Sequence, residues 1–155
     1  MLETALVALE HSLLATALRQ STWVYPLVNA GHVAGLGLLI GSIVPLDLRL
    51  LGHGRLLPLD GLWHLLGRVA MAGLGLAIVC GALLFITDAV AYAQSSLFRA
   101  KMALLGVGIA NALLARRARP RGAATPIGRR LRVHAIVSLA VWPAVLLLGR
   151  LIGYF

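Results

Sequence analysis

Four long apolar stretches, separated by shorter polar connections, set the pattern of this sequence. Each stretch approaches the twenty or so apolar residues that a helix needs to cross a bilayer. The pattern predicts an all-α integral membrane protein, a four-helix bundle that forms a single domain over residues 1–155. The spanning helices are expected at about 23–44, 69–87, 97–114 and 132–152.

The segment before the first span carries a different pattern. In residues 2–20 the leucines recur at helical spacing along one face, while Glu3 and Glu10 share another face. This segment is too polar to cross the bilayer and is predicted to be an amphipathic helix that lies at the interface. Because it has acidic residues and no basic n-region, it is not expected to be a cleaved signal peptide.

Prolines and small residues indicate where the helices bend and pack. Pro45 is expected to bend or stop the first span, with Asp47 and Arg49 in the polar connection that follows. Pro143 should kink the fourth span. Small residues at a spacing of four allow another helix, or a flat ligand, to approach closely, and they occur as Gly31/Gly35, Gly37/Gly41 and Gly73/Ala77/Gly81.

Composition supports a membrane location. Hydrophobic residues make up 60% of the chain, charged residues only 12%, and the mean hydropathy is +0.92. A soluble protein of this size could not cover its surface with so few charges, so lipid is the expected solvent. Cys80 is the only cysteine, which excludes an intrachain disulfide.

The net charge of +9 comes largely from one connection. Seven of the thirteen arginines lie between Arg116 and Arg132. Basic loops remain on the cytoplasmic side, so both termini are predicted to lie outside the cytoplasm, in a bacterial inner membrane. The cluster also suits anionic lipid headgroups. Nucleic acid is not an expected partner, because no aromatic or groove-reading element accompanies the arginines.

His32 is the one ionisable side chain inside the first apolar run. It lies about nine residues beyond Trp23, or roughly 13 Å deep at 1.5 Å per residue, and Lys101 lies about 6 Å inside the third span. Both therefore belong to the outer half of the membrane, where Gly35 would leave room for a ligand. His32 is the candidate ligand of a metal or a haem iron, and Lys101 a candidate partner for a carboxylate, propionate or quinone oxygen. Alternatively, His32 hydrogen-bonds another helix and Lys101 reaches outward to the interface.

A second candidate site lies on the opposite side. The second helix is expected to start around residues 62–66, before it enters the membrane, so His64 and His134 lie at the starts of the second and fourth helices. Paired histidines on opposing helices hold haem in membrane b-type cytochromes. Histidine at a helix end beside arginines can also be simply solvated. Asn111 in the third span is either a cofactor-binding residue or a polar contact between helices.

Other chemistry finds little support in the sequence. Only five carboxylates are present, and none is predicted inside a spanning helix, so neither an acid/base dyad nor a proton-coupling carboxylate is expected. The chain has no CxxC, HExxH or P-loop motif. Whether the protein is an enzyme is left open.

The first span resembles that of an uncharacterised family of bacterial four-helix membrane proteins. The family pattern is a tyrosine-proline, a histidine-x-x-glycine and a closing aspartate-leucine-arginine-leucine-leucine-glycine. The matching residues here are Tyr25-Pro26, His32, Gly35, the run Asp47 to Gly52, and, later in the chain, Gly81, Phe98, Lys101, Asn111, Trp142, Gly149 and Arg150. The resemblance covers nearly the whole chain and brings no assigned activity.

A histidine in the first span with a lysine in the third is also remotely similar to the copper-resistance D proteins and the membrane protoporphyrinogen oxidases. That resemblance implies a haem, porphyrin or copper pocket near His32 and Lys101. Haem b is the one cofactor named as a candidate. The tryptophan-rich surroundings of those families are absent.

Three functions follow from these observations. The first is a haem- or metal-binding redox protein with His32 as the principal ligand. The second is a non-catalytic subunit that packs through its small residues against a larger membrane complex or a second copy of itself. The third is a small transporter for a metal or an organic ion.

Overall fold

The computed structural model describes residues 2–54, 56–118 and 127–154, and within these residues all regular structure is helical. Four helices are long and apolar enough to cross a membrane, which confirms the predicted all-α, four-helix membrane-type bundle. They are α3 (Val24–Leu51), α4 (Leu59–Phe85), α6 (Ser96–Ala118) and α7 (Arg129–Leu151). The shorter helices are α1 (Leu2–Glu10), α2 (Leu13–Gln20), η1 (Ile86–Asp88) and α5 (Ala89–Gln94).

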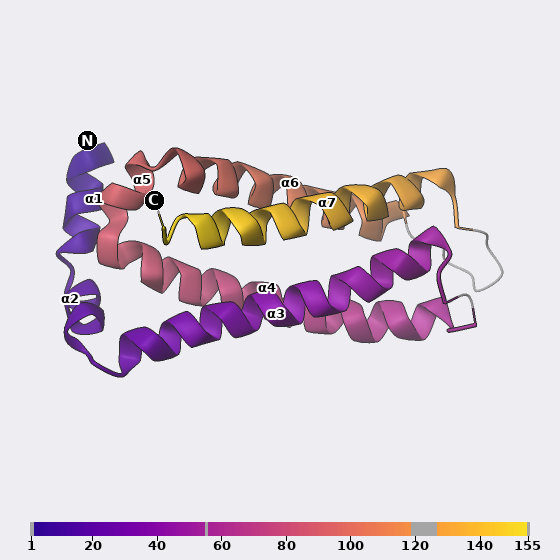
Figure 1. Cartoon of the computed structure of the whole chain (residues 1–155), viewed down its shortest axis with the longest axis horizontal. Helices are drawn as coiled ribbons and strands as arrows, with labels where there is room; N and C mark the ends of the chain where they lie inside the picture. Colours follow the sequence, from indigo (N-terminus) through magenta and orange to yellow (C-terminus); the bar gives the residue numbers. More distant parts are fainter. Residues whose placement is uncertain (1, 55, 119–126, 155) are drawn as a thin grey trace.

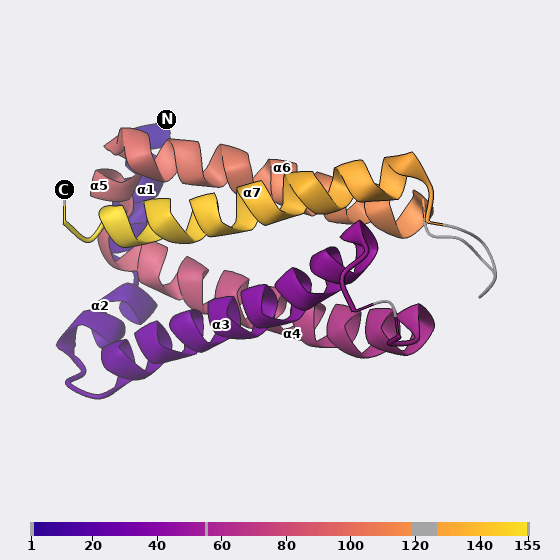
Figure 2. The same ribbon diagram turned by 45° about the vertical axis from the view of Figure 1, so that its right-hand side comes forward.

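The four long helices form two hairpins stacked as two layers (Figures 1 and 2). Helix α3 packs along α4, α6 packs along α7, and the layers meet mainly through α3 and α7. Both termini lie at the same end of the bundle, as Figure 1 shows. We call this the terminal end, and the opposite end the loop end.

Helix α3 does not stop at Pro45, so the predicted end near residue 44 is wrong. It continues to Leu51 and ends at Gly52, whose φ of 108° is a left-handed conformation that favours glycine. Leu46 and Leu50 are buried beyond the proline, and their packing compensates for the one lost hydrogen bond. Asp47 therefore lies inside a candidate spanning helix rather than in a connection.

The second long helix begins at Leu59, three residues before the start expected around 62–66 and well before the span expected from about 69. Pro58 precedes it in an extended conformation, and Leu59 and Trp63 pack against a core formed by Leu50, Leu131 and Ala135. Because these contacts stabilise the first turns of α4, the polar connection between α3 and α4 is short. The third and fourth spans begin at Ser96 and Arg129, within a few residues of the predicted starts.

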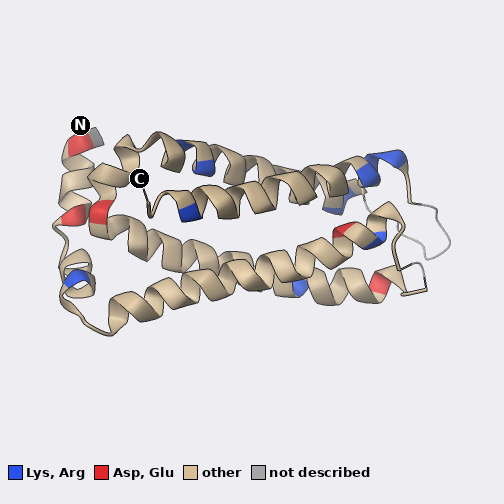
Figure 3. Ribbon diagram, in the orientation of Figure 1, with Lys and Arg blue, Asp and Glu red and all other residues tan. Residues whose placement is uncertain are grey.

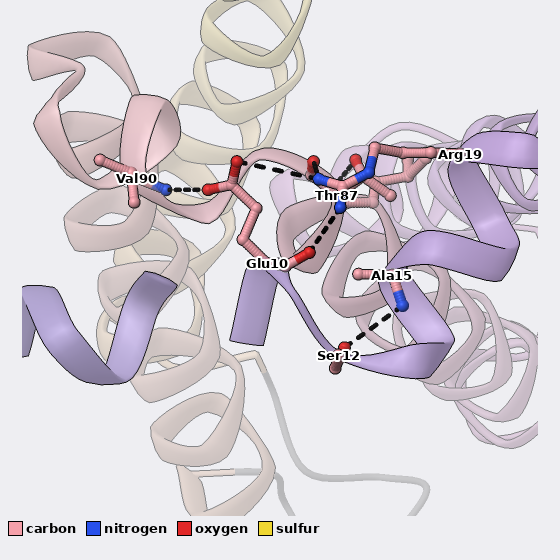
Figure 4. A network of polar contacts seen from close by, with 7 residues as sticks. Glu10, Ser12, Ala15, Arg19, Thr87 and Val90 are labelled. Carbon is pink, nitrogen blue, oxygen red and sulfur yellow. Dashed lines mark hydrogen bonds and ion pairs between the residues drawn. The ribbon is translucent and has the colours of Figure 1, made fainter. Parts of the chain in front are cut away.

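The predicted single helix over 2–20 is divided in two. Ser12 interrupts it and caps α2, because its hydroxyl oxygen accepts a hydrogen bond from Ala15 N at 3.2 Å. Figure 4 shows how the two pieces are fixed to the bundle. Arg19 donates to Thr87 O at 2.8 Å and to Glu10 O at 2.6 Å, and Glu10 Oε2 accepts from Val90 N at 3.4 Å.

The helices of the first hairpin approach closely through the predicted small residues. A Cβ added at Gly35 would lie 2.6 Å from Ala77 N and 2.7 Å from Gly73 O. Further along, Leu39, Ala70 and Trp142 form a buried cluster at the centre of the bundle. Basic residues gather towards the loop end (Figure 3). Arg55, Arg119 and Arg121 of the predicted basic connections lie outside the described residues.

Candidate functional site

His32 is held by the neighbouring helix α4. Its Nδ1 lies 2.7 Å from the carbonyl oxygen of Ala77. The ring also lies beside Gly81, where an added Cβ would be 3.0 Å from His32 Cε1 and 3.1 Å from Nδ1. The small-residue stripe of α4 thus provides a hydrogen-bond acceptor and a space for the imidazole.

The contact with Ala77 determines which ring nitrogen carries hydrogen. A carbonyl oxygen can only accept, so His32 Nδ1 must be the donor. In the neutral ring the other nitrogen, Nε2, then has a free lone pair. Histidines that ligate a metal are commonly oriented in this way, with the second ring nitrogen donating to a backbone carbonyl.

Lys101 lies on α6 against Gly149 of α7. A Cβ at Gly149 would be 3.2 Å from Lys101 Nζ and 3.3 Å from Cε. His32 and Lys101 line one cavity of about 660 Å³, which we call the terminal-end cavity. The structure thus brings the two residues to a common pocket. Its volume lies within the range of about 300–1,000 Å³ that is usual for ligand sites.

Aromatic side chains form the terminal side of this cavity. Phe85 stacks on Phe98 with ring centroids 5.3 Å apart, and Tyr92 lies 6.2 and 5.6 Å from these two rings. All three line the cavity. Tyr92 belongs to α5, outside the spanning helices, and burial raises the pKa of its phenol, with smaller contributions from Tyr25 and Asp88.

A second cation lines the cavity near its mouth. Arg150 is exposed, donates to Tyr154 Oη at 2.7 Å and places its guanidinium 4.8 Å above the centre of that ring. Together with Lys101 it makes this cavity suitable for a ligand that carries carboxylates. The sequence singled out Arg150 only through the family pattern.

Asn111 and His134 form a reciprocal pair towards the loop end. Asn111 Nδ2 donates to the carbonyl oxygen of His134 at 2.9 Å, and the Nδ1 of His134 lies 2.8 Å from Asn111 Oδ1. Because Nδ2 is the donor of the amide, Oδ1 accepts, and His134 Nδ1 carries hydrogen. The pair joins α6 to α7, which is the helix-contact role that the sequence left open for Asn111.

His64 and His134 line a different cavity, of about 510 Å³, which we call the loop-end cavity. They lie on α4 and α7, and Asn111 lines the same space. The loop-end cavity shares only part of its wall with the terminal-end cavity, namely Leu39, Leu74 and Trp142. The six predicted cofactor-binding residues therefore do not form one site.

The sequence did not assign Asp47 or Trp142 to this second cavity. Both are buried and line it, and the Ser138 side chain lies within reach of the Asp47 carboxyl. A helix ended at Pro45 could not place Asp47 there. The expectation that no spanning helix contains a carboxylate is therefore wrong.

Two further predictions concern packing and metals. Gly35 lines neither cavity, since it is in contact with Gly73 and Ala77. In this structure Gly35 serves the close packing of α3 against α4. Among the described residues, no group of three or more His, Cys, Asp and Glu side chains could hold a metal ion.

Comparison of the chain with protein-family models, with curated proteins and with solved structures gave no match.

Proposed function

We propose that this protein binds a haem or a porphyrin-like ligand in the terminal-end cavity, with His32 as the ligand of its iron, and that it serves a redox or electron-transfer role in the membrane. The observation that carries the proposal is the hydrogen bond from His32 Nδ1 to Ala77 O, at 2.7 Å. It fixes the ring and leaves the lone pair of Nε2 for a ligand.

The residues of the cavity suit such a ligand. A haem iron is held by its porphyrin and needs only one or two protein ligands, so a single histidine is sufficient where a bare metal ion would require more. Lys101 and Arg150 supply positive charge for propionates, and Phe85, Tyr92 and Phe98 supply aromatic surface. When bound, the haem would provide one-electron chemistry, while the protein orients the group and excludes water.

The arrangement of charges supports the proposed orientation. Basic residues gather towards the loop end, and both termini lie at the other end (Figure 3). With the loop end in the cytoplasm, the terminal-end cavity would belong to the outer half of a bacterial inner membrane. The arginines at the loop end would then contact anionic lipid headgroups.

The test is an absorption spectrum and an iron analysis of the protein purified from haem-replete cells. We expect a Soret band for the natural protein, no band for His32→Ala, and a normal band for His53→Ala, whose histidine is exposed in a loop. Recovery of the band when imidazole is added to His32→Gly would assign the ligand. A natural protein without a Soret band or bound iron would refute the proposal.

One observation favours a second candidate, the accessory subunit. Gly37 and Gly41 form a GxxxG pair on α3, are exposed, and would meet nothing within 4 Å if they carried a Cβ. Such a pair is typical of the contact face between membrane helices. Under this function, Gly37→Leu with Gly41→Leu should abolish co-purification of a partner, or self-association, and leave the monomer folded. Unchanged association would exclude this surface.

A further inference from the structure

Two residues that line the loop-end cavity carry buried polar groups that the proposed haem site does not use, and one of them, Trp142, also lines the terminal-end cavity. Asp47 on α3 is 6% exposed, and Trp142 on α7 is 2% exposed. Among the described residues, neither Asp47 Oδ2 nor Trp142 Nε1 has a hydrogen-bond partner. Buried polar atoms are nearly always paired, because leaving them unpaired is costly. An orphaned acceptor and an orphaned donor on two residues that line one cavity are therefore the observation from which we argue for a ligand.

The register of α7 places the two residues about one helical turn apart along the bundle. Ser138 lies within reach of the Asp47 carboxyl, so Asp47 is level with Ser138. Trp142 follows Ser138 by four residues, which is about one turn, or roughly 6 Å along the helix at 1.5 Å per residue. A matching ligand carries a hydroxyl that donates to Asp47 and, at a comparable distance, an oxygen that accepts from Trp142. The two oxygens on opposite sides of a quinol ring have this relationship.

The walls of the cavity suit a flat apolar ring. Leu39, Ile43, Leu46 and Leu74 line it on the α3 and α4 sides, and its volume is about 510 Å³. The lining also includes polar side chains, namely His64, Arg68, Asn111, Arg116, His134 and Ser138. Mostly apolar walls with a few converging polar groups are typical of sites for small organic molecules.

The seam between α4 and α6, where the two hairpins meet, is loosely packed. Helices α4 and α6 both line the cavity, but they lack the extensive mutual packing seen for α3 with α4 and for α6 with α7. A contact that bridges this seam joins Arg116 Nη1 to Met71 Sδ at 3.1 Å, and both side chains are exposed. A lipid-soluble molecule could therefore enter by displacing two exposed side chains.

From these observations we infer that the loop-end cavity is a second binding site, distinct from that of His32, for a lipid-soluble quinol. One hydroxyl of the quinol donates to Asp47 Oδ2, and the oxygen across the ring accepts from Trp142 Nε1–H. This inference does not depend on the haem proposal, since none of the residues assigned to the haem site lines the loop-end cavity, although Trp142 lines both cavities.

The test is isothermal titration of the full-length protein in detergent with a decyl-substituted benzoquinol, kept reduced under nitrogen. The natural protein should bind it at one saturable site. Asp47→Asn should weaken binding by about tenfold or more, because a neutral amide oxygen is a weaker acceptor than a carboxylate. Trp142→Phe should weaken it by a similar factor, because it removes the N–H donor together with one ring. The matched controls Asp88→Asn and Trp23→Phe change exposed residues at the terminal end and should bind normally.

The oxidised quinone provides a second measurement. It has carbonyl oxygens that only accept, so it should bind the natural protein more weakly than the quinol. The side-chain amide introduced by Asp47→Asn can donate a hydrogen bond, so this variant should bind the quinone at least as well as the quinol. This reversal of preference would not result from a general loss of folding.

Three results would overturn the inference. The first is the absence of saturable binding to the natural protein. The second is normal quinol affinity in Asp47→Asn, which would mean that water satisfies the two groups. The third is loss of binding in His32→Ala with normal binding in Asp47→Asn, which would place the quinol in the other cavity. Helicity by circular dichroism establishes that each variant is folded.

Discussion

The imidazole of His32 occupies the space that a side chain at position 81 would need. A Cβ built on Gly81 would be 3.0 Å from His32 Cε1, which is closer than the two atoms can comfortably approach. The absence of a side chain on α4 therefore decides where a histidine on α3 can lie. The same relationship holds between Lys101 on α6 and Gly149 on α7.

Gly81→Ala should displace the His32 ring and weaken its hydrogen bond to Ala77. Since the groups that orient a metal-ligating histidine usually contribute about 10–100-fold to affinity, we expect a loss of that order in haem affinity. Haem titration followed by absorbance would measure it. Gly75→Ala is the matched control on the same helix, because a Cβ there meets nothing within 4 Å. Equal affinities of the two variants would contradict the proposed role of Gly81.

Gly35→Ala should destabilise the first hairpin. The new Cβ would lie 2.6 Å from Ala77 N, and backbone on both sides would have to separate. Forced overpacking of this kind typically costs about 1–3 kcal/mol of unfolding free energy. Unfolding in mixed micelles with increasing SDS would measure the change. Gly37→Ala on the exposed side of α3 should be neutral, and equal stability of both variants would show that the hairpin adjusts without cost.

Much of the fold could be predicted from the sequence because lipid imposes a simple rule. A spanning helix must be long and apolar, so α3, α4, α6 and α7 are visible as apolar runs. The small residues of α4 at a spacing of four also correctly indicated close packing, which Gly35 and Gly73 provide. These features are local, and one segment at a time is enough to recognise them.

The contents of the cavities were harder to predict, since they depend on the register between helices. Whether α3 continues past Pro45 is decided by the packing of Leu46 and Leu50, which lies outside any local pattern. Asp47 was therefore assigned to a connection. Predicting that Asn111 pairs with His134 likewise requires knowing how far α6 is shifted along its axis relative to α7. Hydrophobic periodicity gives no information on that shift.

Asn111→Leu should break the link between α6 and α7. It would leave the Nδ1–H of the partly buried His134 ring without its partner, while the His134 carbonyl would keep its bond within α7. Unsatisfied groups of this kind cost about 1–3 kcal/mol each, so the unfolding free energy should fall by at least about 1 kcal/mol. The control is Ala110→Leu, which adds the same side chain at the exposed neighbouring position. If Asn111→Leu were as stable as this control, the pair would have no structural role.

Tyr92 should make the protein less stable at high pH. Burial raises the pKa of its phenol above the ordinary value of 10.0, so above that pH the unfolded chain releases the proton more readily than the folded one. The unfolded state then binds fewer protons, and stability falls as the pH rises through the folded pKa. Tyr92→Phe should reduce this slope. Unfolding measured between about pH 9 and 11 would check it, and an unchanged slope in the variant would assign the loss to other groups.

Arg19→Gln should release the terminal helices α1 and α2 from the bundle with little loss of global stability. Arg19 belongs to α2 and donates to Thr87 O of η1 at 2.8 Å and to Glu10 O of α1 at 2.6 Å. It also forms an ion pair with the Glu10 carboxylate at 3.8 Å. An ion pair at this exposure contributes at most about 1 kcal/mol. The local effect should be larger, because the same side chain also satisfies two backbone carbonyls.

Hydrogen exchange should therefore accelerate in residues 2–20 and remain unchanged in α4 and α7. Arg99→Gln changes an exposed arginine in the first turn of α6 and serves as the control. Equal exchange in the two variants would mean that apolar contacts alone, such as those of the buried Ala15 and Leu18, hold these helices across the end of the bundle.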